Sequence, residues 1–516
     1  MTLDAVGLEV MAHAFASIAE EMGLVLIRSA LSPNIRERRD CSAALFDAEG
    51  DMIAQAAHIP VHLGALTDSV AAIGALRPAP GDVFILNDPY AGGSHLPDVT
   101  LIEAIAVNGS LAGYSAVRAH HSDVGGTQPG SMPAAARRLD EEGVVLPPTR
   151  LTLEVEESFL AQVRTPQTRR GDLAAQRAAV ARGGDGLRAL IARYGRGAVR
   201  SAARDLITYA GRRTRAVLAA MPAAGLVATD WLEGDGVDDA DIPITVRVDI
   251  RAGTFRVDFA GTAPAAAGNV NCPLAVTRAA VLFVVRTLLP DDIPTNAGVQ
   301  GAVRVVAPEG CLVNARYPSA VAAGNVETSQ RIADTVFLAL ARGGLPVPAQ
   351  GQGTMNNITF GAIGDGPRGL GDWTYYETIG GGQGASRGAS GPSAVHVGLS
   401  NTRNTPIEVL EMELPLRVRR YALRAGSGGT GAWAGGEGVL REFEALAPME
   451  ANIVSERRRH APLGAAGGGP GTRGGNTLRA AALGAKAHAR LEPGDVLRIE
   501  TPGGGAWGEP ARGGEP

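Results

Sequence analysis

The chain has 516 residues and a formal net charge of −5 at pH 7. Its arginines are dispersed and form no basic stripe, which excludes the electrostatic footprint of a nucleic-acid-binding protein. Because single hydrophobic cores stop growing near roughly 250 to 300 residues, the length predicts a large soluble protein of two or three domains.

The first predicted element is an amphipathic helix over 4–30, whose apolar side chains recur at helical spacing. Three glutamates fall within its apolar run and no basic leader precedes it, so it resembles neither a signal peptide nor a membrane span. The three cysteines are far apart in sequence, which indicates reduced thiols and no zinc-finger spacing. We therefore expect a cytoplasmic protein with no membrane partner.

Two β-hairpins follow this helix. The first is predicted from strands over 41–46 and 51–57, and counting pairs back from its turn places Asp40 beside Ala57 and His58. If the two hairpins abut, Asp40 can reach the residues of the second one.

The second hairpin is predicted from strands over 99–106 and 111–118, joined at Asn108-Gly109, a strong type I′ turn signal. Counting back from this turn places Asp98 opposite Ala119 and His120 opposite Pro97. Positions paired across such a hairpin are about 5 Å apart. His95 and His120 are 25 residues apart in the sequence, and this pairing makes them neighbours.

Five of the nine histidines lie in this region, between residues 58 and 121. His95, Asp98 and His120 converge at the end of the second hairpin, and Gly92-Gly93 allows the backbone to approach closely there. Imidazoles and carboxylates on glycine turns are suitable ligands for a divalent metal. The pattern predicts a metal site, with a local turn-stabilising pair of His95 and Asp98 as the simpler alternative.

The remaining elements complete an α+β, multi-domain fold class, with a helical insertion, a mixed α/β middle part and a glycine-rich β C-terminal part. They are two exposed helices within 172–220, strands over 244–250 and 254–259, helices over 276–289 and 326–342, and glycine-rich stretches over 343–393 and from 426 onward. The predicted domains are 1–230, which carries the metal site and the helical segment 172–220, then 231–420, and finally 421–516.

Lys486 is the only lysine among 48 basic residues. The phosphate-binding loop G-x-x-x-x-G-K-[ST] requires a lysine that reaches the β and γ phosphates, so this chain has no such loop. A lysine Schiff base is equally disfavoured, because Lys486 lies in a stretch of small residues. If the reaction consumes ATP, we expect another chain to bind it.

Long motifs run through nearly the whole chain. They include SPNIRERRD (32–40), HIPVHLGAL (58–66), GDVFILNDPYAGGSHLPD (81–98), AHHSDVGGTQPGSMP (119–133), NCPLAVTRAA (271–280) and AAGNVETSQRIAD (322–334). Together they closely resemble the B-type chains of the hydantoinase B/oxoprolinase family. The resemblance implies a subunit that works with a larger, ATP-binding A-type subunit in a hetero-oligomer.

On matching positions, the resemblance implies that one divalent metal is bound by Asp40, His95, Asp98 and His120. Mixed nitrogen and oxygen ligands suit zinc, manganese, iron and cobalt, so the ligand set does not identify the metal. Asp40 is the weakest of these ligands, since it can instead accept hydrogen bonds from neighbouring arginines or backbone amides. His58 is its natural substitute.

Further roles are predicted for residues near these ligands. His121 or Asp123 is the candidate for catalytic proton transfer to the leaving nitrogen. Asp88 is the candidate substrate-binding residue, although an Asx turn before Pro89 is the routine interpretation. His62 is more typical of a packing group or of one that orients a ligand.

The predicted function is the metal-dependent hydrolytic subunit of an ATP-dependent hydantoinase or 5-oxoprolinase, which opens the ring of a phosphorylated small-molecule cyclic amide. A subunit of a ketone carboxylase of the acetone or acetophenone type is the second interpretation. A non-catalytic scaffold for the kinase-like subunit is the third.

Overall fold

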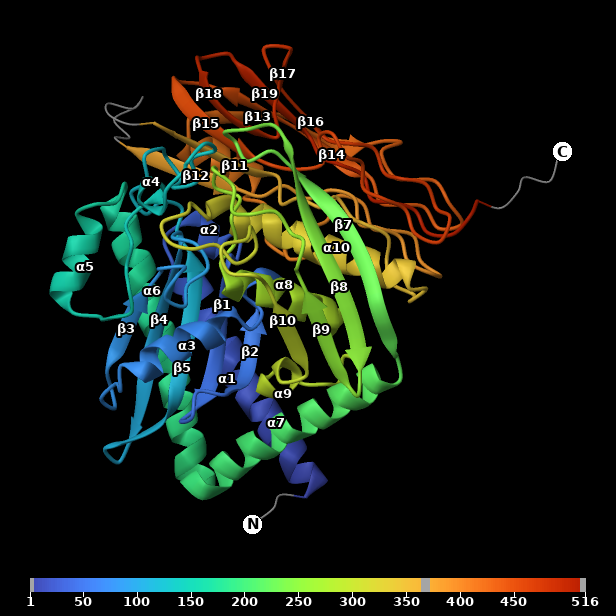
Figure 1. The fold of residues 1–516 in the computed structure, drawn as a ribbon. Helices are drawn as coiled ribbons and strands as arrows, with labels where there is room; N and C mark the ends of the chain where they lie inside the picture. Colours follow the sequence, from blue (N-terminus) through green and yellow to red (C-terminus); the bar gives the residue numbers. More distant parts are fainter. Residues whose placement is uncertain (1–3, 363–371, 511–516) are drawn as a thin grey trace.

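The computed structural model describes residues 4–362 and 372–510, which form several sheets with helices packed against them (Figure 1). The predicted mixed, multi-domain fold class is confirmed. The blue and cyan N-terminal sheet, the green and yellow middle part and the orange and red C-terminal strands are distinct in this view.

The N-terminal sheet has six antiparallel strands, and it carries the candidate metal site. Its strands, in pairing order, are β2 (Met52–Ala57), β1 (Cys41–Asp47), β5 (Ser110–His120), β4 (Asp98–Val107), β3 (Val83–Leu86) and β6 (Thr149–Arg150). Both predicted hairpins are therefore confirmed, and they lie side by side because β1 pairs with β5.

Alternate residues of these strands face opposite sides of the sheet. Even-numbered residues such as Phe46 and Ala116 pack with helix α3 (Ala65–Ala75). Odd-numbered residues such as Leu45 and Val117 pack with the helices of the other face, α1 (Ala5–Ser29) and α6 (Pro166–Tyr194). The sheet is thus covered on both faces.

The expectation of two exposed helices within 172–220 is wrong, because each of them buries one face. The α6 helix packs against α1 and the sheet, because its small residues allow close approach. A Cβ atom on Gly183 would lie 2.5 Å from Met22 Sδ and 2.7 Å from Ser115 Cβ. The second helix, α7 (Arg196–Ala219), follows α6 and runs along the bottom edge of the molecule in Figure 1.

The register of the second hairpin differs from the predicted one by a single residue. Val107 pairs with Ser110 as expected, but a bulge at Ala112 shifts the strands so that Asp98 pairs with His120. A shift of one residue moves side chains to the opposite face of a sheet. The bulge therefore places Asp98 and His120 on the same face as a direct cross-strand pair.

The first hairpin also departs from its predicted register. Ser42 pairs with Ala57, so Asp40 is displaced by two residues from the expected position along β2. The Asp47 carboxylate accepts hydrogen bonds from the backbone N–H groups of Glu49 and Asp51, which holds a wider turn than the sequence count assumed.

The middle part contains a second sheet with the strand order β10, β9, β8, β7. Helices α8 and α10 pack against it and against each other (Figure 1). Its elements are β7 (Ala223–Glu233), β8 (Asp241–Arg251), β9 (Thr254–Asp258), α8 (Leu274–Thr287), β10 (Val303–Val306) and α10 (Ser329–Arg342). A π-helical turn, Gly324–Thr328, leads directly into α10.

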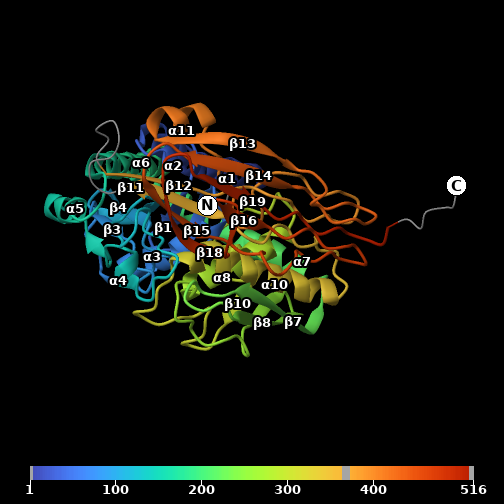
Figure 2. The ribbon, with the colours of Figure 1, turned by 90° about the horizontal axis from the view of Figure 1, so that it is seen from above.

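The C-terminal part consists of two sheets that enclose a shared apolar core. Figure 2 shows strands of both sheets layered over the rest of the molecule. One sheet has the order β12 (Trp373–Glu377), β11 (Asn357–Ala362), β15 (Met449–Val454), β18 (Lys486–Leu491), and the other β13 (Leu416–Arg424), β14 (Gly438–Ala445), β19 (Val496–Glu500), β16 (Gly475–Leu478), β17 (Ala481–Leu483). Strand pairing in this part thus begins at Asn357, before the predicted segment 421–516.

Short helices connect these parts. They are α2 (Pro33–Arg36), the 3-10 turn Pro60–His62, α4 (Leu139–Glu142), α5 (Leu153–Leu160), α9 (Ala297–Gln300) and α11 (Ile407–Glu413).

The long N-terminal helix shares some features with a membrane span. Val6–Ser29 is long and apolar enough to cross a membrane, by length and composition alone. One face of the helix is buried in the protein, where Phe15, Met22 and Leu26 join the core beneath the sheet, while Val10 and Leu24 are exposed. It therefore behaves as a core helix in this fold.

Candidate metal centre

The candidate site forms where β4 begins and β5 ends. Asp98 is the first residue of β4 and His120 the last of β5, and they are directly paired. His95 precedes β4 on the loop that contains Gly92 and Gly93. A Cβ atom on Gly93 would lie 2.4 Å from the Asn87 carbonyl oxygen, so this loop requires glycine to pack closely.

Three potential ligand atoms lie close together. His95 Nε2 is 3.2 Å from His120 Nδ1 and 3.3 Å from Asp98 Oδ1, and the distance from His120 Nδ1 to Asp98 Oδ1 is 3.4 Å. All three side chains are buried. Donor atoms on the edge of a tetrahedron with metal bonds of about 2.0–2.1 Å are about 3.3–3.4 Å apart. These three residues could therefore hold a metal ion.

Hydrogen bonding around the cluster supports this assignment. His95 Nδ1 lies 3.3 Å from the Ala322 carbonyl oxygen, which fits an N–H donor there and leaves Nε2 free as a ligand. Among the described residues, Asp98 Oδ1 accepts no hydrogen bond despite its two imidazole neighbours. A buried carboxylate oxygen without a donor is costly, and a bound cation would compensate it.

The electrostatics favour an ionised Asp98 and a neutral His120. Burial opposes ionisation of Asp98, but the nearby His95 and His62 imidazoles hold the pKa of this carboxyl well below its usual range. Burial lowers the pKa of His120, which favours its neutral form. Its ring also stacks on Tyr376, with centroids 4.4 Å apart, so its orientation is fixed.

The second oxygen of Asp98 is held by three neighbours. Ser94 Oγ donates to Oδ2 at 2.6 Å, His62 Nε2 lies 3.2 Å away and Asn325 Nδ2 lies 3.4 Å away. His62 Nδ1 is in turn 3.1 Å from Ser42 Oγ. These contacts orient Asp98, and they place His62 behind the carboxylate, on the side of its second oxygen.

Replacing His62 with alanine is expected to weaken metal binding by about 10- to 100-fold without abolishing it, because groups that orient a ligand have effects of this size. Metal titration of the purified protein measures the change. His488→Ala, at an exposed histidine on β18, is the control and should bind metal as the wild type does. An unchanged affinity in His62→Ala would contradict the orienting role.

Asp40 is buried beside the cluster but is not part of the three-residue group. Its carbonyl oxygen accepts a hydrogen bond from the His120 backbone N–H at 3.0 Å. His58, the alternative ligand, lies against α1, since a Cβ atom on Gly23 would be 2.3 Å from His58 Nε2. A ligand role for Asp40 stays a prediction.

The predicted proton-transfer residues have other contacts. The His121 ring faces α6, on the opposite side of the sheet from His120, and its Nε2 is 2.9 Å from Gln176 Oε1. Burial lowers its pKa to about 4. Asp123 forms an ion pair of 2.9 Å with Arg164 and accepts backbone hydrogen bonds from Gly125 and Gly130. These contacts are typical of structural roles, and the catalytic role stays a prediction.

Asp88 lies in the turn that leads to the glycine loop. Its carboxylate accepts a hydrogen bond from the Tyr90 backbone N–H at 2.9 Å, as expected for an Asx turn. Burial raises its pKa. Its role in substrate binding stays a prediction.

Sequence reasoning missed the contribution of the segment that ends in the π-helical turn. Ala322 contacts His95, and Asn325 contacts Asp98, more than 200 residues away in the chain. Glu142 holds this segment by accepting the Ala322 N–H at 2.8 Å. The one signal in the sequence was the motif AAGNVETSQRIAD, in which both residues lie.

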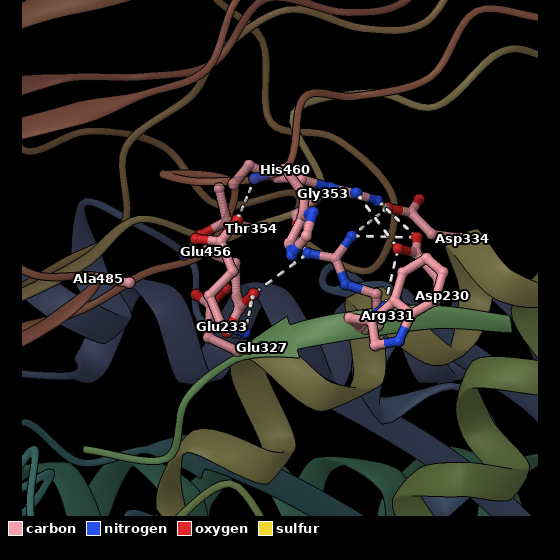
Figure 3. Close-up of polar contacts among 12 residues, drawn as sticks. Asp230, Glu233, Glu327, Arg331, Asp334, Gly353, Thr354, Glu456, His460 and Ala485 are labelled. Carbon is pink, nitrogen blue, oxygen red and sulfur yellow. Dashed lines mark hydrogen bonds and ion pairs between the residues drawn. The ribbon is translucent and has the colours of Figure 1, made fainter. Parts of the chain in front are cut away.

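A second buried polar cluster joins the middle part to the C-terminal sheets (Figure 3). Arg331 of α10 lies 3.3 Å from Asp230 of β7 and 3.3 Å from Glu456, and Arg457 lies 2.9 Å from Asp230. Lys486 also pairs with Glu456, so the only lysine of the chain is engaged in an ion pair. We assign this cluster a structural role.

Glu327, in the same cluster, makes stability depend on pH. Burial and the Glu456 carboxylate raise its pKa from 4.5 to about 8. Between these values the folded chain keeps a proton that the unfolded chain has lost, so the free energy of unfolding falls by about 1.4 kcal/mol per pH unit as pH rises.

The Glu327→Gln variant should lack this contribution. Chemical denaturation between about pH 5 and 7.5 measures it. We expect a shallower decline in the variant than in the wild type. Two parallel profiles would contradict the raised pKa.

Fold and site together define a mixed α/β protein with a buried imidazole and carboxylate cluster that could hold a metal ion. The family model for Hydantoinase B/oxoprolinase matches residues 4–510, and the chain belongs to this family. The resemblance seen in the sequence motifs is thereby confirmed.

Two relatives illustrate the range of the family. A 5-oxoprolinase 1 from Arabidopsis thaliana is 38% identical over 543 residues, which cover 98% of this chain and 42% of that protein. A putative B-type subunit of a D-/L-hydantoinase from Pseudomonas sp. (strain NS671) is 30% identical over 540 residues, which cover 98% of this chain and 90% of that protein. The chain spans about two fifths of the length of several curated relatives.

Two solved structures share the fold. The ATP-dependent caprolactamase from Pseudomonas jessenii has a TM-score of 0.90 at 27% identity, covering 99% of this chain and 92% of that one. A nucleotide-free acetone carboxylase has a TM-score of 0.85 at 18% identity, covering 97% of this chain and 76% of that one. The second likeness concerns the fold alone.

Proposed function

We propose that the chain is the metal-dependent hydrolytic subunit of an ATP-dependent cyclic amide hydrolase that opens a phosphorylated lactam or hydantoin ring. The observation that carries this proposal is the buried cluster of His95, Asp98 and His120, whose ligand atoms lie close enough to share one metal ion. Relatives named as a 5-oxoprolinase and as a hydantoinase chain, and a structural neighbour named caprolactamase, support the choice of cyclic amides.

The residues of the cluster have separate tasks in this proposal. His95 and His120 supply ring nitrogens, Asp98 supplies a carboxylate oxygen, and Asp40 is the proposed fourth ligand. A divalent cation bound there would lower the pKa of a water molecule and polarise a carbonyl oxygen. Ser94 and His62 keep the carboxylate oriented, and the surrounding buried side chains exclude bulk water.

We place ATP on a partner. An amide carbonyl is a poor electrophile, and phosphorylation of its oxygen makes it susceptible to attack by hydroxide. This chain has no phosphate-binding loop, and its lysine is held in an ion pair. The hydantoinase relative is named as one subunit of its enzyme, which supports a hetero-oligomer with an A-type ATP-binding chain. We expect the complex in the cytoplasm.

The alternatives have weaker support. The chain is 18% identical to the acetone carboxylase, and this likeness concerns the fold. A carboxylase subunit is therefore the second candidate. A non-catalytic scaffold would not need two buried imidazoles and a buried carboxylate with ligand atoms 3.2–3.4 Å apart.

The test combines the purified chain with its A-type partner, ATP and a panel of hydantoins, 5-oxoproline, caprolactam, and ketones with bicarbonate. Ring opening that requires ATP and metal is the expected result. Product from a ketone only, with bicarbonate required, would establish the carboxylase instead. A folded complex without metal and without turnover on any substrate would favour the scaffold.

A further inference from the structure

We propose that Arg118 binds an oxyanion beside the metal centre, and that this anion is the phosphoryl group of the activated substrate. The proposal rests on the proposed function for the identity of the anion. The binding site itself follows from the contacts of the guanidinium.

Arg118 is completely buried, and only neutral groups bind it. Its Nε donates to Thr100 Oγ1 at 2.9 Å, and its Nη2 donates to Ser69 Oγ at 2.8 Å and to the Gly92 carbonyl oxygen at 3.4 Å. Its Nη1 has no hydrogen-bond partner among the described residues. The guanidinium is therefore anchored by two nitrogens and has one nitrogen free to bind a ligand.

Four other fully buried arginines have a carboxylate partner, which Arg118 lacks. Arg169, Arg331, Arg441 and Arg457 each lie within 3.3 Å of a carboxylate oxygen. Within residues 4–362 and 372–510, Arg118 has no such ion pair at 4.0 Å or less. The carboxylates of Asp98 and Asp68 act on its charge only from beyond ion-pair distance. A buried cation without a counter-ion in contact is unfavourable, so an anionic ligand would complement it.

Arg38 provides an internal comparison. It is equally buried and also lacks a carboxylate partner within the described ranges, yet each of its three nitrogens has an acceptor. Those acceptors are the Arg403 and Tyr376 carbonyl oxygens and the side chains of Asn34, Thr378 and Thr402. Arg38 is thus satisfied by the protein itself, whereas Arg118 is not.

The register of the hairpin places Arg118 next to the cluster. Thr100 pairs with Arg118, and Asp98 pairs with His120, so the two pairs occupy successive positions on the same face of the sheet. Such positions are about 7 Å apart. The Arg118 side chain also contacts the glycine loop that leads to His95. An anion bound by Nη1 would therefore lie within reach of a substrate at the metal centre.

A cavity of about 260 Å³ lies between α3 and α8, near these groups. Its lining includes Leu63, which follows His62, and Asp68, which precedes Ser69. His62 contacts Asp98, and Ser69 contacts Arg118. Arg118 and the three candidate ligands lie behind this lining and are not part of it.

A phosphoryl group fits the donor better than a neutral amide does. Guanidinium groups bind phosphate oxygens through charge-assisted hydrogen bonds, which are about twice as strong as neutral ones. An O-phosphorylated amide brings this anion next to the carbon that is attacked. An unphosphorylated substrate would leave Nη1 unpaired, so Arg118 would select the activated form.

The test is calorimetric titration of the full-length protein with inorganic phosphate, in the metal-free and the metal-loaded form. We expect binding by the wild type and at least tenfold weaker binding by Arg118→Gln. Arg118→Lys keeps the positive charge but loses the several N–H donors of the guanidinium, so it should weaken phosphate binding less than Arg118→Gln does. Arg188→Gln, at a half-exposed arginine of α6, is the matched control and should bind phosphate as the wild type does.

Several outcomes would overturn the assignment. One is a wild type that binds no phosphate, and another is a folded Arg118 variant with unchanged phosphate affinity. Arg118-dependent binding of bicarbonate or acetate, without phosphate binding, would reject the phosphoryl group. The result is separable from the proposed function, because metal content and ring opening are measured independently of phosphate affinity.

Discussion

Replacing His95 or His120 with alanine is expected to reduce metal content to below about a tenth of the wild-type value and to abolish ATP-dependent turnover. Each substitution removes one of three ligand atoms that lie 3.2–3.4 Å apart. Loss of one of so few ligands leaves too little binding energy to retain a divalent cation at micromolar concentration. Elemental analysis of freshly purified protein measures the metal directly.

The control is His13→Ala, at a histidine on α1 whose side chain is 78% exposed. It should keep both metal and activity. Circular dichroism checks that the variants are folded, since a truncated buried imidazole also leaves a small cavity. Stoichiometric metal in a folded His95→Ala or His120→Ala variant would show that the proposed coordination is incorrect.

The sequence was sufficient to predict that these residues meet, and the reason is local. A short turn at Asn108-Gly109 determines which strands pair, and the pairing brings residues 95, 98 and 120 together. The bulge at Ala112 was not predictable, because a bulge depends on packing on both faces of the sheet. It changed the partner of Asp98 from Ala119 to His120.

Contacts made over long sequence distances were beyond the sequence pattern. Asn325 reaches Asp98 because the π-helical turn and the N-terminal sheet pack together, and no periodicity records that packing. The burial of α6 was missed for a related reason. A helix rich in alanine, glycine and arginine has no stripe of large apolar residues to predict burial, but here the small residues face the sheet and the arginines point outward or form ion pairs.

The buried ionic cluster was also invisible in the sequence, since its members come from β7, α10, the segment after β15, and β18. Its charges are spread over more than 250 residues. Only the tertiary fold shows that Lys486 has a defined partner, Glu456.

Replacing Arg331 with methionine is expected to lower the free energy of unfolding by about 3–5 kcal/mol, the cost of removing one partner from a buried ion pair. Methionine fills much of the same volume, so the loss is chiefly electrostatic. Arg331 is completely buried and lies 3.3 Å from Asp230, 3.5 Å from Asp334 and 3.3 Å from Glu456. Its removal leaves these carboxylates with fewer counter-ions in a region that water does not reach.

Denaturant unfolding of the full chain measures the effect, and Arg479→Met is the matched control. Arg479 pairs with Asp495 at the surface, where its side chain is 53% exposed, so its loss should cost about 0–1 kcal/mol. Equal, small losses in both variants would mean that the cluster contributes little to stability. A large loss of stability in Arg331→Met alone, with metal content preserved, would show that the buried ionic cluster stabilises the contact between the middle and C-terminal parts. It would also show that this contribution is independent of the metal centre, because the two clusters use different side chains.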